Sequence, residues 1–189
     1  MLSIPYNKPY ITGNEFQYIE SAIANRHLSG NGKYTHLCHQ FLIDKYQFKK
    51  CLLTTSCTDA LEMCAILLDI KPGDEVIMPS FTFVSTANAF ILRGAKIIFA
   101  DSSSSSPNID EDQIEKIITP KTKAIVVVHY AGVACNMDIV MAIAIKHNLF
   151  VVEDAAQAID SFYINKENEK QPLGSIGHLA AFSDRKSVV

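Results

Sequence analysis

Short apolar runs alternate with helix-like segments from residue 51 to the end of the chain. Each run has the length of a strand. Strand–helix–strand units of this size join parallel strands, so we predict an α/β fold in which a mostly parallel sheet lies between helices. Ligand sites in such folds lie at the carboxyl ends of the strands. The predicted strands are CLLT (51–54), EVIMP (75–79), AKIIFAD (95–101), KAIVVVHY (123–130), LFVVED (149–154) and HLAAFS (178–183).

Helices are expected between these runs. KAIVVVHY is so apolar that it should form a buried central strand, with helices covering both faces of the sheet. Asp110, followed by Gln113, has the pattern of a capping box. Gly94 follows Arg93 as a helix-ending residue would. The predicted helices are 58–70, 83–93, 111–118 and 137–147.

The first 45 residues have a different pattern. Residues 12–29 read as an amphipathic helix, and GNGKYT (30–35) as a glycine-rich loop. We predict that residues 1–45 form an arm that packs against the main sheet or a partner subunit. Residues 46–183 form the main domain, because no linker divides them.

Charge and composition favour a small-molecule ligand. The formal net charge is -3 and the chain has no block of Lys and Arg, so it lacks the basic surface that nucleic acids or anionic membranes require. No apolar stretch approaches the roughly 18 residues of a membrane span. The N-terminus has no basic region followed by an apolar one, so we expect a cytoplasmic protein.

The cysteines indicate neither a disulfide framework nor a zinc site. They are five in number, and none forms a CxxC pair. HLCHQ does bring His36, Cys38 and His39 close together, but no second ligand cluster follows downstream. A buried thiol with surface imidazoles is therefore the preferred interpretation, and we expect no metal.

In TTSCTDAL, small hydroxyl residues lie where the apolar run 51–54 ends and the next helix is predicted to begin. Thr55, Ser56 and Thr58 could combine with free backbone N–H groups and the helix dipole to bind a phosphate. Equally, Ser56 or Thr58 could simply cap the helix. Taken by itself, the stretch favours the helix cap.

Two further stretches have side chains suited to a planar, cationic ligand. Glu153 and Asp154 directly follow a buried strand, where a carboxylate needs a partner; a cationic ligand group would supply one, or Asp154 merely caps a loop. Phe81 or Phe83 could lie over a flat ring, although both could be core residues, which is the better default for phenylalanine. A phosphate site, a carboxylate and an aromatic face together match pyridoxal phosphate (PLP). No GxGxxG follows a strand, which disfavours a dinucleotide-dependent reductase.

Four stretches resemble the DegT/DnrJ/EryC1/StrS family of PLP-dependent nucleotide-sugar aminotransferases: GDEVIMPSFTFVSTANAF, VVVHYAG, HNLFVVEDAAQ and LGSIGHLAAFS. The resemblance runs from IPYNKP to Ser183. It implies the large domain of a fold type I aminotransferase, truncated before the C-terminal small domain. It also implies a homodimer with active sites at the subunit interface.

The resemblance implies a role for each matching residue. Cys57, Thr58 and Ser183 should contact the phosphate, and Phe83 should stack on the ring. Asp154 should pair with the ring nitrogen, and Gln157 should lie near the ring's 3-hydroxyl. L-glutamate is the implied amino donor. A dTDP-4-keto-6-deoxyhexose is the implied acceptor, giving dTDP-4-amino-4,6-dideoxygalactose for enterobacterial surface polysaccharides.

The resemblance stops after Ser183. The family's cofactor-binding lysine lies five positions beyond this serine, where the chain has Val188, and Lys186 is two residues out of register. Residues 184–189 form a non-family tail, DRKSVV, which is also the translation of a common sequencing adapter; we expect it not to be part of the natural protein. We therefore expect no catalytic lysine in this chain, and the alternative function is a non-catalytic protein that binds PLP or a nucleotide sugar.

Overall fold

The computed structural model describes residues 11–184, and the chain divides into two compact units. The first unit ends at Leu53 and contains helices α1 (Glu15–Ala24) and α2 (Lys33–Tyr46). The second begins at Thr54 and contains the sheet. The predicted domain boundary after residue 45 falls in the last turn of α2.

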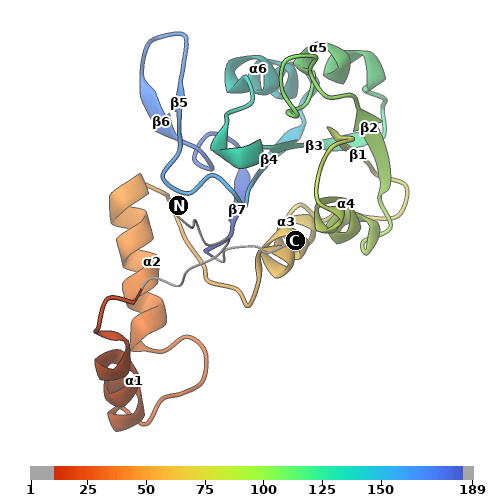
Figure 1. The fold of residues 1–189 in the computed structure, drawn as a ribbon. Helices are drawn as coiled ribbons and strands as arrows, with labels where there is room; N and C mark the ends of the chain where they lie inside the picture. The colour runs from red at the N-terminus through yellow and green to blue at the C-terminus, as the bar shows by residue number, and fades with distance from the viewer. Residues whose placement is uncertain (1–10, 185–189) are drawn as a thin grey trace, which may run out of the picture. The chain divides into compact units, whose positions relative to one another are not determined.

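The second unit is built on a five-stranded parallel sheet (Figure 1). Its strand order is β2-β1-β3-β4-β7, so β3 is central, as its apolar sequence predicts. Every neighbouring pair is parallel, which brings the carboxyl ends of the strands to the same edge. The strands are β1 (Glu75–Pro79), β2 (Lys96–Ala100), β3 (Thr122–Val128), β4 (Phe150–Ala155) and β7 (Leu179–Phe182).

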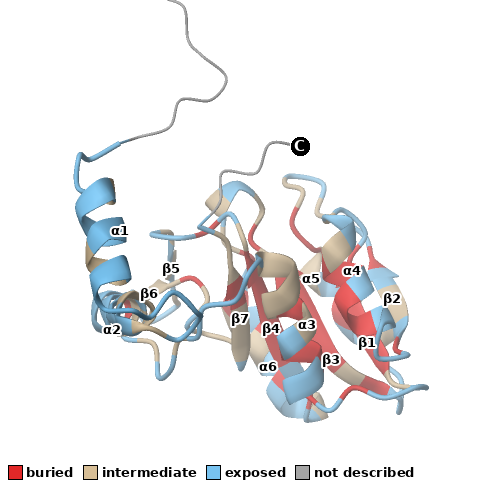
Figure 2. Ribbon diagram, turned by 90° about the horizontal axis from the view of Figure 1, so that it is seen from below, coloured by how far each residue is buried: buried red, intermediate tan, exposed pale blue. Residues whose placement is uncertain are grey.

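Helices cover both faces of this sheet. α3 (Cys57–Leu67) and α4 (Val84–Ile91) pack on one face, and α5 (Glu111–Ile114) and α6 (Met137–His147) on the other (Figure 1). Because side chains alternate along a strand, Val76 joins the core under α3 and α4 while Ile77 joins the core under α6. Buried residues are concentrated along the central strands (Figure 2). The α/β prediction is confirmed.

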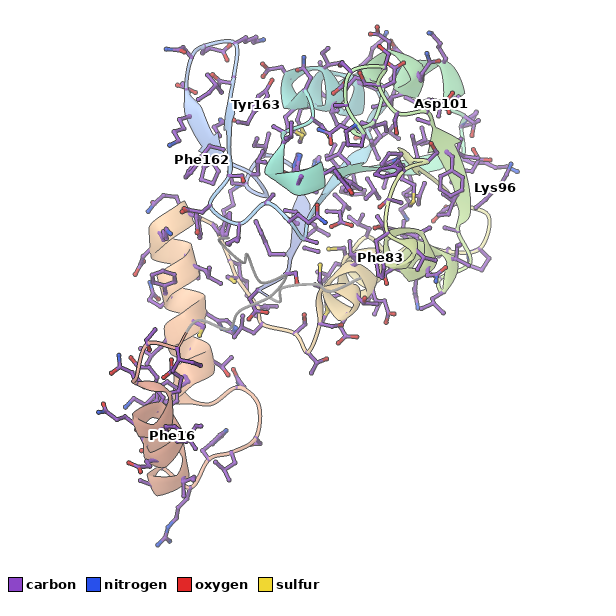
Figure 3. All side chains as sticks on the ribbon, viewed as in Figure 1. Phe16, Phe83, Lys96, Asp101, Phe162 and Tyr163 are labelled. Atoms are coloured by element: carbon purple, nitrogen blue, oxygen red, sulfur yellow. The ribbon has the colours of Figure 1, made fainter. Side chains whose placement is uncertain are left out.

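Short elements complete the described chain. Two 3-10 turns follow α5 and β3, at Glu115–Ile117 and Tyr130–Gly132. An antiparallel hairpin of β5 (Phe162–Ile164) and β6 (Lys170–Pro172) was not predicted. Its Tyr163, labelled in Figure 3, donates a hydrogen bond from its hydroxyl to Asp138 Oδ2 at 2.9 Å. Among residues 11–184, no helix combines the length and the apolarity needed to cross a membrane.

Two predictions near the N-terminus are wrong. CLLT (51–54) is not a strand: Leu52 and Leu53 are exposed, and the Leu53 N–H donates to His39 Nε2 at 2.9 Å instead of to a neighbouring strand. GNGKYT (30–35) is not only a loop, since α2 begins inside it at Lys33. The helix start has no sequence signal, because Gly32 at its N-cap offers no side-chain oxygen.

The remaining predicted helices overlap the observed ones, although several observed helices are shorter than predicted. α6 occupies residues 137–147 as predicted, and Gly94 follows α4 with a φ of 87°. The predicted capping box is altered: Gln113 donates to the side chain of Asp110 at 3.2 Å, and Asp110 accepts the Asp112 N–H at 3.1 Å. α1 is shorter than the predicted helix 12–29, because Arg26 takes a left-handed conformation at φ 52°.

Candidate functional site

The N-terminus of α3 lies at the carboxyl end of the sheet. Ser56 is the N-cap, and its hydroxyl accepts the Asp59 N–H at 3.1 Å. The preceding N–H groups of the first turn, those of Cys57 and Thr58, have no acceptor within the helix by geometry and point outward with the positive end of the dipole. Capping and anion binding are therefore compatible here, with the capping done by Ser56.

Neighbouring side chains set the hydrogen bonding and the charge around the N-terminus of α3. Thr58 donates from its hydroxyl to Ser85 Oγ of α4 at 3.1 Å. Burial raises the pKa of the Cys57 thiol to about 12, with a further contribution from the nearby Asp154 charge, so Cys57 is an uncharged thiol at neutral pH. Asp59, in the same turn, bonds to the Thr55 hydroxyl, and hydrogen bonds from Thr55 and Ser56 lower its pKa.

Asp154 is a buried carboxylate at the carboxyl end of β4. Only 5% of the residue is exposed. Its Oδ2 accepts the Thr86 hydroxyl at 2.7 Å, and its Oδ1 accepts the Ala156 N–H at 3.2 Å. The bond from Ala156 is the loop-capping contact that the sequence allowed for Asp154. Two neutral donors do not replace the hydration that burial removes, and the pKa of Asp154 is consequently raised.

Thr86 and Thr82 extend this hydrogen-bond chain. The Thr82 hydroxyl donates to Thr86 Oγ1 at 2.8 Å, and Thr86, fully buried, donates its own proton to Asp154. Both donors therefore point toward the carboxylate. Sequence reasoning missed Thr86; the signal that could have found it is the pair of threonines four residues apart at the start of a helix that follows a strand.

Replacing Thr86 by Val is expected to destabilise the unliganded chain by about 1.5–3 kcal/mol at neutral pH, since it removes a hydrogen bond to a buried charge without changing the side-chain volume. The pKa of Asp154 should rise further, because the Thr86 bond lowers it. Urea denaturation and carbon-13 NMR titration of Asp154 measure the two effects. Thr82→Val is the control: it removes a hydroxyl one step farther away and should cost about 0.5–1.5 kcal/mol. Equal losses in both variants would contradict this role.

The raised pKa of Asp154 also predicts a pH dependence. Its ordinary value is 3.8, and burial raises it in the folded chain. The folded state then binds this proton more tightly than the unfolded state, so Asp154 makes the unliganded chain less stable as the pH rises from about 4 through the raised pKa. Other carboxyl groups, such as Asp59 and Glu115, have lowered pKa values and act in the opposite direction. The difference in unfolding free energy between wild type and Asp154→Asn, measured against pH, isolates Asp154; a flat difference would rule out its raised pKa.

Phe81 and Phe83 are not core residues. They are 50% and 60% exposed, which overturns the core alternative for both. Phe83 is the N-cap residue of α4 and lies beside the start of that helix (Figure 3). Phe81 packs edge-on against Tyr130, with 5.1 Å between ring centroids. Phe83 is therefore an exposed aromatic side chain at the start of the helix that carries Thr86.

Gln157 and Ala131 join the loops that follow β4 and β3. Gln157 Oε1 accepts the Ala131 N–H at 2.7 Å, which leaves its amide nitrogen to donate to a ligand. Gly132, next in the loop, has a φ of 78°, and a Cβ there would lie 2.7 Å from Ser161 Oγ. This close approach holds the 130–132 turn against the segment after Gln157.

Ser183 directly follows β7 and is partly buried. Ala155 at the end of β4 is paired in register with Phe182, so Ser183 follows at the same sheet edge as Asp154. Lys186 and Val188 lie outside the described residues. The assignment of Cys57, Thr58, Phe83, Asp154, Gln157 and Ser183 to individual cofactor contacts remains a prediction.

The arrangement fits PLP in its donor chemistry. The helix start presents N–H groups to an anion, and Asp154 presents a buried carboxylate that, within residues 11–184, accepts hydrogen bonds from the neutral donors Thr86 and Ala156. A protonated ring nitrogen is the kind of partner that such a carboxylate requires. Phe83 and Gln157 add a ring face and an amide donor.

Comparison with known proteins identifies the family. The model of the DegT/DnrJ/EryC1/StrS aminotransferase family matches residues 9–184. The chain belongs to this family. A spore coat polysaccharide biosynthesis protein, SpsC of Bacillus subtilis, is 39% identical over 95% of this chain and 45% of its own length. A GDP-perosamine synthase of Caulobacter vibrioides is 35% identical over 93% of the chain and 46% of its own. The chain thus spans about half the length of these curated relatives.

Solved structures of aminotransferases share the fold. An aminotransferase from Psychrobacter cryohalolentis superposes with a TM-score of 0.86 at 33% identity, covering 94% of this chain and 44% of that one. The sugar aminotransferase Spr1654 of Streptococcus pneumoniae, solved in a PLP form and a PMP form, also gives 0.86 at 29% identity, covering 97% and 49%. The fold type expected from the resemblance, an aminotransferase large domain, is confirmed. The PLP form of a relative supports the expected cofactor.

Proposed function

We propose that the whole protein is a PLP-dependent nucleotide-sugar aminotransferase that transfers an amino group from L-glutamate to a 4-keto-6-deoxyhexose. The observation that carries the proposal is the buried carboxylate of Asp154, held by Thr86 at the same sheet edge as the N-terminus of α3. Membership of the aminotransferase family supports the reaction type. Relatives named for polysaccharide and perosamine synthesis support a sugar acceptor.

Different residues of the site bind PLP and hold the proton on its ring. PLP, when bound, supplies an electron-withdrawing ring that labilises bonds at the amino acid α-carbon. Asp154 keeps the proton on the ring nitrogen, and Thr86 keeps Asp154 in place. The first turn of α3 with Ser183 binds the phosphate, and Gln157 donates to the ring oxygen. Phe83 covers one ring face and limits the access of water.

A binding experiment on the chain tests this assignment. Equilibrium dialysis should show binding of PLP, weaker binding of pyridoxal, which lacks the phosphate, and competition by inorganic phosphate. Asp154→Asn should weaken PLP binding about tenfold while leaving competition by phosphate unchanged, because the two act at different ends of the ligand. Equal affinity for PLP and pyridoxal would contradict the phosphate site at α3.

The absence of a lysine at position 188 supports a second candidate for the chain alone: binding of PLP without turnover. Incubation with PLP, reduction with borohydride and mass spectrometry would reveal any lysine that carries the pyridoxyl group. We expect no specific labelling. Specific labelling of Lys186 would overturn this view.

The proposal also specifies the nucleotide that is attached to the sugar acceptor. The motif resemblance points to a dTDP-linked sugar, whereas relatives named GDP-perosamine synthase point to GDP. We retain the dTDP-4-keto-6-deoxyhexose, and assaying the whole protein with both nucleotides distinguishes the two. A cytoplasmic homodimer completes the proposal, and light scattering of the whole protein tests the dimer.

A further inference from the structure

Glu153 is a fully buried carboxylate that the proposed reaction does not use. It lies next to Asp154 on β4, and because side chains alternate along a strand the two carboxylates point to opposite faces of the sheet. Glu153 has an exposed fraction of 0%. Burying a charge is costly unless the charge is fully hydrogen-bonded. The groups that donate to Glu153 therefore indicate its role.

Four donors converge on this carboxylate. Oε1 accepts the backbone N–H groups of Ile176, at 2.8 Å, and of Gly177. Oε2 accepts the Gly174 N–H at 2.7 Å and the ring nitrogen Nε2 of His129 at 2.9 Å. Each oxygen thus faces two donors, and the carboxyl group carries no proton in this arrangement. One side chain thereby holds the loop 174–177 that leads into β7.

His129 connects the same carboxylate to a second loop. Its ring is also fully buried, and its Nδ1 accepts the Cys135 N–H at 3.2 Å. Nδ1 must therefore be unprotonated, so Nε2 carries the proton and donates it to Glu153. The loop that follows β3, from His129 to Cys135, is in this way attached to Glu153 through one imidazole.

Both loops lead to predicted site residues. In the loop after β3, the Ala131 N–H bonds to Gln157 at 2.7 Å. In the loop before β7, the backbone of Gly174 packs so closely under the Phe182 ring that a Cβ there would overlap it. Phe182 immediately precedes Ser183. The contacts therefore run from Glu153 through His129 to Gln157, and from Glu153 through Gly174 to Ser183.

We propose that Glu153 is a positioning residue that sets the relative positions of Gln157 and Ser183 from the face of the sheet opposite Asp154. Because it takes these two residues as cofactor contacts, the inference rests on the proposed function. A carboxylate is required at this position. Gln would place an NH2 group against two donors whichever way its amide lay.

Residue-resolved amide exchange by NMR on the 189-residue chain tests the proposal without any ligand. In Glu153→Gln, the amides of Gly174, Ile176, Ala131 and Ser183 should exchange about tenfold faster, while those of α6 keep their rates. The matched control is Asp154→Asn, the same chemical change one residue along the strand, which should leave residues 174–177 unaffected. Acceleration throughout the second unit, or none at Ala131 and Ser183, would overturn the proposal.

Two variants of His129 provide a second test if Glu153→Gln does not fold. Gln can place an amide N–H near the position of Nε2 and keep the bond to Glu153, whereas Asn can place an oxygen near Nδ1 and keep only the bond to Cys135. We expect Ala131 to exchange about tenfold faster in His129→Asn and near the wild-type rate in His129→Gln. Both variants remove the imidazole ring, so equal acceleration would indicate a packing role alone and contradict the proposal.

PLP affinity, measured on the same variants, separates this inference from the proposed function. We expect about tenfold weaker binding in Glu153→Gln and in His129→Asn. If no variant and not even the wild type binds PLP, the proposed cofactor site fails, while the exchange pattern still supports the positioning role. If the wild type binds PLP and both variants bind it equally well, the positioning role is refuted and the cofactor site stands.

Discussion

Asp154→Asn is expected to lower glutamate-dependent amination by the whole protein by about 100-fold or more, while it stabilises the unliganded chain at neutral pH. The two effects have one cause. Asp154 is 5% exposed, and its oxygens accept bonds only from the neutral donors Thr86 and Ala156 among the contacts found in residues 11–184. Its charge therefore costs stability until a cationic group binds beside it.

Amination is measured from the amino sugar formed, and stability from urea denaturation of the 189-residue chain. Asp101→Asn is the matched control: Asp101 directly follows β2 as part of the same sheet edge, but it is exposed (labelled in Figure 3). It should change neither quantity by a measurable amount. Wild-type turnover in Asp154→Asn would refute the assignment of Asp154 to the ring nitrogen.

Gly174→Ala should destabilise the chain by about 2–5 kcal/mol. The φ of Gly174 is 82°, in the left-handed region that disfavours residues with a Cβ, and the added Cβ would overlap the Phe182 ring. Phe182 ends β7, so relief of the overlap must move either the ring or the 174–177 loop that Glu153 holds. The free energy of unfolding, measured in urea, should fall accordingly.

Gly73→Ala separates the two contributions. Gly73 has a similar φ of 96°, but nothing lies within 4 Å of a Cβ there. Its loss should be about 1–2 kcal/mol, the cost of backbone strain alone. If the two alanine variants lose the same stability, the contact between Phe182 and Gly174 contributes nothing and its part in the positioning of Ser183 is disproved.

Much of the second unit could be predicted from the sequence. The strand EVIMP (75–79) and the helix 137–147 are correct, and the strand KAIVVVHY (123–130) is correct except that it ends at Val128. Their apolar period and their flanking turn residues are local signals. The first unit was harder to predict from the sequence. α2 begins at Lys33 after a glycine N-cap, and CLLT has strand-like residues but no strand beside it. Local propensity cannot tell whether a neighbouring strand is present.

In the candidate site, too, some residues could be predicted from local sequence and others could not. Asp154 and the α3 N-terminus were predicted from residue type and from their place beside a strand or at a helix start. Phe83 was chosen over Phe81 only by the family resemblance. Thr86 was not predicted, because its contact with Asp154 spans 68 residues of sequence. The exposure of Phe83 was not predicted from the residues, because the core is the default place for phenylalanine.

The sequence by itself determined the α/β class and the family motifs, and it predicts the sheet edge at which we expect a ligand. The reason is that apolar periodicity and side-chain chemistry are properties of short segments. Only the tertiary structure decided that Thr86 faces Asp154 and that Glu153 joins His129 to the 174–177 loop. The physical reason is that these bonds depend on strand order and on the alternation of side chains across β4. That geometry places two adjacent carboxylates in separate networks, one toward the proposed cofactor and one behind it.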